Sequence, residues 1–107
     1  MDDVMNHSKL VRDKVPDFIR TKGTVPRIHI ASDEEYRQKL KEKLQEEVNE
    51  FLGGESPEEL ADILEVVYAL AAVQDIDQSS LEARRKKKAE ERDAFSRHII
   101  LDEMRQP

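Results

Sequence analysis

Hydrophobic residues recur every three or four positions between residues 36 and 51, with charged residues between them. On a helix this spacing forms one apolar stripe, made of Tyr36, Leu40, Leu44, Val48 and Phe51. The capping-box pattern Ser32-Asp33-Glu34-Glu35 precedes the stripe, and Gly53-Gly54 follows it. We therefore predict a long helix that begins at about residue 33 and ends at about residue 52.

The next stretch, residues 60–73, is hydrophobic on nearly every side apart from Asp62 and Glu65. Ser56-Pro57 precedes it, a cap followed by a proline suited to the first helical position. A helix that is apolar all round is expected to be buried, so we predict that it forms the centre of a bundle or of a dimer.

Weaker signals lie on either side of these helices. Pro16 suits the first turn of a short helix ending near Gly23, and Ser79-Ser80-Leu81-Glu82 predicts a charged helix that extends to about Phe95. Two short apolar runs, residues 27–31 and 98–101, can pair as a two-stranded β ribbon. The predicted fold class is all-α, a helical bundle with this ribbon as an optional addition.

Size and composition point to one domain over residues 1–107, with residues 1–8 frayed. The chain is 39% charged and has only five aromatic residues, so its core is thin. We expect oligomerisation to complete the bundle, as a homodimer or homotetramer.

Composition also excludes several classes of protein. The chain has no cysteine, and therefore no disulfide, thiolate metal site or thiol nucleophile. The net charge of −6 argues against binding a nucleic acid polymer. No leader pattern and no apolar run of membrane-spanning length is present, so we expect a cytoplasmic protein without a membrane partner.

Two acidic motifs lie on the neighbouring predicted helices: Glu46-Glu47-x-x-Glu50 and Glu59-x-x-Asp62. Residues three apart share a helix face, so a hairpin would bring these carboxylates together. Clustered carboxylates need a cation, a shared proton or open solvent. Oxygen ligands favour Mg²⁺, with Mn²⁺ as a second choice.

Helical geometry strengthens the case for some of these acids. At about 100° per residue, Glu47 falls inside the apolar stripe, with Glu46 and Glu50 near its margin. A charge that is merely solvated belongs on the opposite face. Asp62 is similarly out of place, one turn into an apolar helix, and a buried carboxylate almost always has a partner.

Each acid also has a structural interpretation. Glu59 occupies the capping-box position after Ser56, and Glu46 could be a solvated surface residue. For Glu47, Glu50 and Asp62, an ion pair with lysine or arginine is the strongest alternative. Glu65, three residues after Asp62, either extends the site or hydrogen-bonds its ligands.

Basic residues are available to bind phosphate groups. Three of them gather in a compact segment with a proline, whereas the run Arg84 to Lys88 is most simply a solvated helix face. The candidate phosphate-binding residues are Lys9, Arg12, Lys14, Lys88 and Arg92. The single histidines His7, His29 and His98 show no metal-ligand spacing.

Three motifs together resemble a known family. They are Lys9-Leu10-Val11-Arg12-Asp13-Lys14-Val15-Pro16, Glu46-Glu47-x-x-Glu50 and Glu59-Leu60-Ala61-Asp62-Ile63-Leu64-Glu65-Val66. They resemble the MazG-like branch of the all-α nucleoside triphosphate pyrophosphohydrolases, which includes phosphoribosyl-ATP pyrophosphohydrolase-like proteins. The resemblance implies a helical dimer or tetramer that uses Mg²⁺ to hydrolyse a nucleoside triphosphate to the monophosphate and pyrophosphate.

The resemblance also implies roles for individual residues. The metal ligands would be Glu47, Glu50, Glu59 and Asp62, and the catalytic set Glu46, Glu47 and Glu50, with Glu46 orienting or deprotonating water. Two features depart from the family: only residues 51–58 separate the two acidic motifs, and Arg92-Asp93-Ala94-Phe95 replaces Arg-Gly-Gly-Phe.

The same chemistry follows from the residue types. Attack of water between the α- and β-phosphates needs a metal that neutralises phosphate oxygens and a carboxylate that positions the water. A P-loop is absent, which argues against a Walker-type ATPase. Two alternatives remain: hydrolysis of phosphoribosyl-ATP, and a non-catalytic helical module whose acids bind metal for stability or form ion pairs. A carboxylate at Asp62, inside an apolar helix, would argue against the second.

Overall fold

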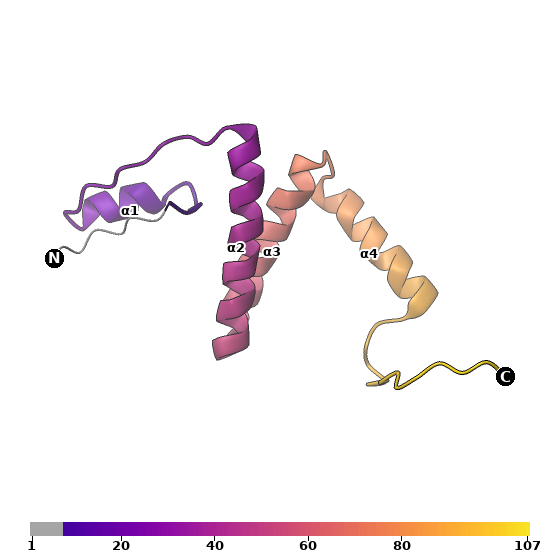
Figure 1. The fold of residues 1–107 in the computed structure, drawn as a ribbon. Coiled ribbons are helices and arrows are strands. Elements are labelled where there is room, and N and C mark those ends of the chain that lie inside the picture. The colour runs from indigo at the N-terminus through magenta and orange to yellow at the C-terminus, as the bar shows by residue number, and fades with distance from the viewer. Residues whose placement is uncertain (1–7) are drawn as a thin grey trace.

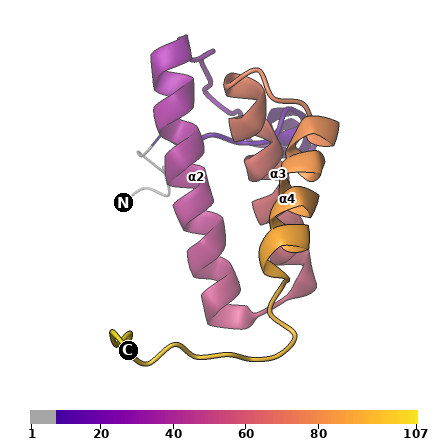
Figure 2. The same cartoon turned by 90° about the vertical axis from the view of Figure 1, so that its right-hand side faces the viewer.

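The computed structural model describes residues 8–107, which form four helices and no strand. These are α1 (Val15–Thr21), α2 (Asp33–Gly54), α3 (Pro57–Val73) and α4 (Gln78–Arg92). The helices α2 and α3 lie side by side as a hairpin, α1 lies to one side of it, and α4 diverges from α3 on the other side (Figures 1 and 2). The all-α prediction is confirmed.

Local sequence explains the hairpin. Ser32 caps α2 by accepting a hydrogen bond from the backbone N–H of Glu35 at 3.2 Å. At the other end, Glu55 adopts the left-handed conformation with φ of 54°, which ends the helix. Ser56 then caps α3 immediately, so the chain reverses within two residues and α3 packs back against α2.

The predicted β ribbon is wrong. Residues 27–31 and 98–101 form no strand and are almost all exposed, and they lie at opposite sides of the molecule (Figure 1). Ile30 is 90% exposed and Ile100 is 78% exposed, so neither run packs against a core. A two-stranded ribbon is marginal in water without such packing.

The bounds of α4 also differ from the prediction. Asp77 caps the helix, two residues before the predicted Ser79, by accepting a hydrogen bond from the backbone N–H of Ser80 at 2.8 Å. The helix ends at Arg92, before Phe95, because Asp93 takes a positive φ of 66°. The expected fraying of the N-terminus falls mainly on residues 1–7, outside the described part of the chain.

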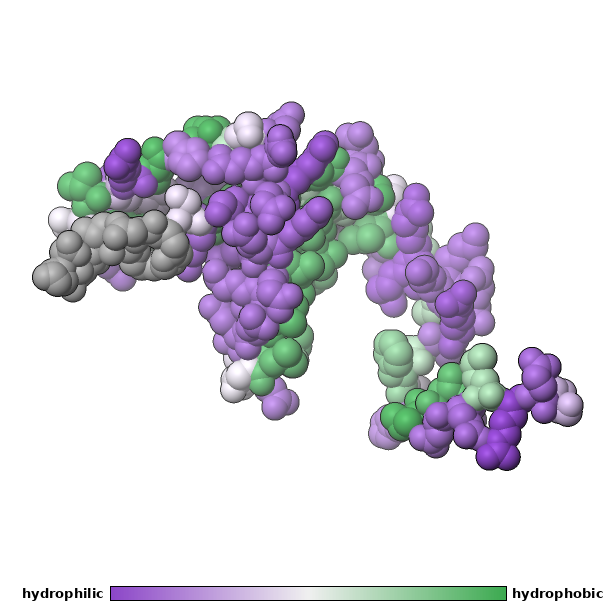
Figure 3. Space-filling model, viewed as in Figure 1, coloured by the Kyte–Doolittle hydropathy of each residue, from purple (hydrophilic) through white to green (hydrophobic). Residues whose placement is uncertain are grey.

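The core is small, and α3 is not buried all round as predicted. Leu40, Val66 and Ala71 are buried, but Leu60 and Leu64 are about half exposed. The reason is that only α2 covers α3 along its length, and hydrophobic side chains remain visible along the edge of the hairpin (Figure 3). The radius of gyration is 18.9 Å, against about 13 Å for a compact chain of this length.

Within residues 8–107, no helix combines the length and the apolar composition that crossing a bilayer requires.

Candidate active site

Among residues 8–107, Glu47 is the only buried acid. It is only 6% exposed, which confirms its predicted place in the apolar stripe of α2. Its Oε2 atom is buried and has no hydrogen-bond partner. A buried carboxylate oxygen without a partner is costly, so this atom marks a position where a ligand would be stabilising.

The other oxygen of Glu47 lies beside Lys43. The Nζ atom of Lys43 is 3.4 Å from Oε1 of Glu47 and 2.9 Å from Oε1 of Glu46. Sequence reasoning did not single out Lys43. Its signal was the spacing, because residues three and four positions apart are neighbours on a helix surface.

The pKa values of Glu47 and Lys43 are raised, and that of Glu46 is lowered. Burial raises the pKa of Glu47, the negative charges of Glu50 and Asp62 raise it further, and Lys43 only partly opposes them. The hydrogen bond from Lys43 lowers the pKa of Glu46, and Lys9 contributes in the same direction. Burial by itself would lower the pKa of Lys43, but its two glutamate partners outweigh burial and raise it.

Asp62 lies on α3, near enough to Glu47 to raise its pKa, but it is not buried as expected. Its side chain is 40% exposed, and its Oδ1 atom accepts a hydrogen bond from Arg12 at 2.7 Å. Because both partners are substantially exposed, this pair contributes about 0–1 kcal/mol. In this structure Asp62 forms the ion pair with arginine that was the alternative to a metal ligand. The position of Asp62 therefore does not exclude a non-catalytic interaction module.

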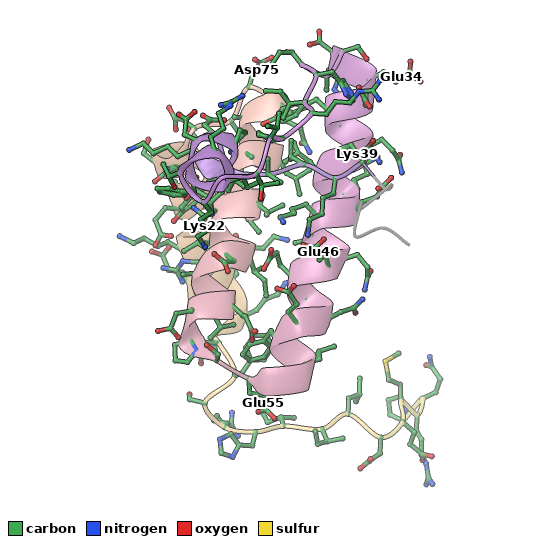
Figure 4. The ribbon with its side chains drawn as sticks, turned by 90° about the vertical axis from the view of Figure 1, so that its left-hand side faces the viewer. Lys22, Glu34, Lys39, Glu46, Glu55 and Asp75 are labelled. Atoms are coloured by element: carbon green, nitrogen blue, oxygen red, sulfur yellow. The ribbon has the colours of Figure 1, made fainter. Side chains whose placement is uncertain are left out.

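The N-terminal segment (residues 8–14) lies beside α2 and brings basic residues to the acids. Lys39 of α2 donates a hydrogen bond to the carbonyl oxygen of Ser8 at 2.9 Å, and the segment crosses α2 near Lys39 (Figure 4). Lys9 reaches to within 3.6 Å of Oε1 of Glu46. The segment thus brings Lys9 and Arg12 to two of the predicted carboxylates.

A cavity of about 310 Å³ lies between this segment and α2. It is lined by residues 8–10 of the segment and by Lys39, Glu42, Lys43 and Glu46 of α2. Its size is at the lower end of small-molecule sites, and the ammonium groups of Lys9, Lys39 and Lys43 belong to residues that line it. Glu42 and Glu46 also line it and pair with Lys39 and Lys43, so the lining carries three positive and two negative side chains. A negatively charged group could bind there by competing with these two glutamates for the lysines.

The remaining candidates lie at the margin or elsewhere. Glu59 acts as a helix cap, accepting a hydrogen bond from the backbone N–H of Ser56 at 3.4 Å, which is the structural interpretation raised for it. Glu50 and Glu65 are exposed on the hairpin. The phosphate-binding candidates that do not reach the acids are exposed: Lys14 at the start of α1, and Lys88 and Arg92 on the diverging α4.

Across residues 8–107, no three histidine or acidic side chains are grouped closely enough to hold a metal ion. The acids instead pair with cations: Lys9 lies beside Glu46, Lys43 beside Glu47, and Arg12 beside Asp62. We call Glu46, Glu47, Glu50 and Asp62 the carboxylate cluster.

Comparison with known proteins gives one partial likeness. An uncharacterized protein of Mycolicibacterium smegmatis is 48% identical over 44 residues, which is 41% of this chain. The matched stretch spans 45% of that relative, a little under half its length. No protein-family model and no solved structure matches the chain.

Proposed function

We propose that this chain is a Mg²⁺-dependent nucleoside triphosphate pyrophosphohydrolase, which releases a nucleoside monophosphate and pyrophosphate. The observation that carries the proposal is the buried, unpartnered Oε2 atom of Glu47. Burial raises the pKa of this carboxylate, and the charges of Glu50 and Asp62 raise it further. Basic residues of the N-terminal segment reach the same cluster. Titratable groups whose pKa values are shifted by burial and by a specific charged neighbour are typical of functional sites.

The residues present fit Mg²⁺ by their chemistry. Carboxylate oxygens are its preferred protein ligands, and Glu47 has one oxygen without a partner. No three acids of residues 8–107 surround one point, so Glu47, Glu50 and Asp62 would have to draw together to hold the ion. Glu59 would join them on releasing the backbone N–H of Ser56. When bound, Mg²⁺ or Mn²⁺ neutralises phosphate oxygens and polarises the group that is attacked.

The chain's own side chains supply the rest of the reaction. Lys9, Lys43 and Arg12 bind phosphate oxygens as charge-assisted donors. Glu46 stays ionised because Lys43 lowers its pKa, and its carboxylate orients the attacking water. Lys9, Lys43 and Glu46 all line the cavity. The water that Glu46 orients would therefore lie next to the phosphate that the two lysines bind.

The exposed part of α3 supports self-association. Leu60 and Leu64 form apolar surface that one chain does not cover, and we place a second copy of the chain on it. The substrate is a nucleotide. We locate the protein in the cytoplasm, a reducing compartment that suits a chain without cysteine.

The second candidate is a non-catalytic helical module stabilised by ion pairs. The contacts of Arg12 with Asp62 and of Lys43 with Glu46 favour it. The unpartnered Oε2 atom of Glu47 favours the catalytic proposal, because a buried acceptor without a partner destabilises a network that serves only stability. Phosphoribosyl-ATP remains an alternative substrate within the catalytic proposal.

Pyrophosphate release from a panel of nucleoside triphosphates and phosphoribosyl-ATP, with and without Mg²⁺, tests the proposal. Release is expected only with Mg²⁺ or Mn²⁺, and Glu47→Gln should abolish it. Glu34→Gln is the matched control, because Glu34 is exposed at the opposite end of α2 from the hairpin turn (Figure 4). Absence of release from every nucleotide would favour the interaction module.

A further inference from the structure

We infer that Lys43 is a positioning residue of the carboxylate cluster, an internal counter-ion that a divalent cation must displace from Glu47. The inference rests on the proposed function, because it assumes that a cation binds at Glu47. It assigns to Lys43 a role that neither acidic motif contains.

Burial distinguishes Lys43 from the other cations near the cluster. Its side chain is 19% exposed and that of its partner Glu47 is 7% exposed, whereas Lys9 and Arg12 are 43% and 58% exposed. Solvent strongly screens the pairs that Lys9 and Arg12 form, and it screens the pair of Lys43 with Glu47 much less. Among these three cations, Lys43 therefore has the strongest electrostatic effect on the carboxylate cluster.

The two oxygens of Glu47 define the competition. Oε1 lies 3.4 Å from the Nζ atom of Lys43, and Oε2 has no hydrogen-bond partner. An ion bound at Oε2 would stand close to the ammonium group, and the two positive charges would repel each other. Binding of the ion therefore favours movement of Lys43 away from Glu47.

Glu46 and the cavity determine where Lys43 goes. Its closer partner is Glu46, at 2.9 Å, and both residues line the cavity between α2 and the N-terminal segment. A lysine released from Glu47 remains bound to Glu46 and presents its other N–H donors to the cavity. Cation binding and the placement of a phosphate-binding ammonium are thus linked through one side chain.

Calorimetric titration of the full chain with MgCl₂ tests this inference. Lys43→Met should bind Mg²⁺ at least about tenfold more tightly than the wild type, because it removes the competing charge and keeps the apolar stem. Lys43→Arg should restore an affinity near the wild-type value. Lys41→Met, which alters an exposed lysine on the same helix, should change the affinity by less than about threefold.

Equal or weaker binding by Lys43→Met would overturn the inference alone, and absence of binding in all four proteins would overturn it together with the metal requirement of the proposed function. If Lys43→Met does not fold, the ¹⁵N NMR signal of the wild-type Lys43 ammonium decides. Added Mg²⁺ should shift that signal and leave the Lys41 signal in place. An unshifted Lys43 signal would contradict displacement.

Discussion

Glu46 and Glu47 are consecutive residues of α2, yet their pKa values shift in opposite directions. Lys43 lies 2.9 Å from Glu46 and lowers its pKa, whereas burial and two neighbouring carboxylates raise the pKa of Glu47. Ionised Glu46 therefore stabilises the folded chain, and ionised Glu47 destabilises it. A carboxylate that destabilises the fold when ionised is consistent with the role proposed for Glu47 as a cation ligand.

The first prediction follows from that contrast in the metal-free protein. Because the folded pKa of Glu47 is raised, the stability of the wild type falls as pH rises from about 4.5 through that pKa. Glu47→Gln removes this loss, so at pH 7 its Tm should be a few degrees higher than that of the wild type. At pH below about 4 the difference should disappear.

Glu46→Gln is the matched variant with the opposite sign. The pKa of Glu46 is lowered in the fold, so its stabilisation is present at neutral pH and is lost as pH falls through that lowered value. The variant should melt below the wild type at pH 7. Thermal melts in the presence of a chelator measure both proteins, and a lower Tm for Glu47→Gln at pH 7 would refute the contrast.

The second prediction concerns Asp62 as a metal ligand. Asp62→Asn keeps the shape and removes the charge, so its affinity for Mg²⁺ should fall by at least about tenfold in a calorimetric titration. Its control is Asp17→Asn in α1, which removes an exposed carboxylate paired with Arg20. If Asp62→Asn binds Mg²⁺ with wild-type affinity, Asp62 is not a metal ligand and only forms the ion pair with Arg12.

The third prediction concerns Arg12. If its guanidinium contacts phosphate equally in the ground and transition states, Arg12→Ala should raise KM with a smaller loss of kcat. Arg20→Ala removes an exposed arginine that pairs with Asp17 within α1, and it should leave both constants unchanged. Steady-state kinetics measures both constants. If KM and kcat of Arg12→Ala equal those of the wild type, the N-terminal segment only packs against the hairpin.

The fourth prediction concerns assembly. Leu64 is 47% exposed within one chain, and a second copy is proposed to cover it. Leu64→Gln should therefore shift the light-scattering mass from a dimer or tetramer towards the monomer while the helical circular dichroism is retained. A wild-type chain that is a stable monomer at micromolar concentration would contradict the proposed interface.

Local sequence predicted the hairpin well, because caps such as Ser32 and Ser56 act within a few residues of themselves. It also predicted that Glu47 is buried, since helical periodicity determines which residues share a face. Contacts between distant segments were harder. The partner of Asp62 is Arg12, fifty residues away, and no local pattern specifies that distance or the half-exposed position of Asp62.

Two further misses have physical causes. Lys43 lies outside both acidic motifs, although its spacing of three and four residues to Glu46 and Glu47 makes it their neighbour on a helix. The β ribbon failed because alternation alone does not supply a surface for Ile30 and Ile100 to pack against.

The central claim is hydrolysis between the α- and β-phosphates, and ³¹P NMR of a nucleoside triphosphate incubated with the full chain and Mg²⁺ tests it most directly. The account predicts that monophosphate and pyrophosphate resonances grow together in the wild type, and that neither grows with Glu47→Gln. A spectrum that stays unchanged with every nucleotide, or one that shows diphosphate and orthophosphate instead, would contradict it.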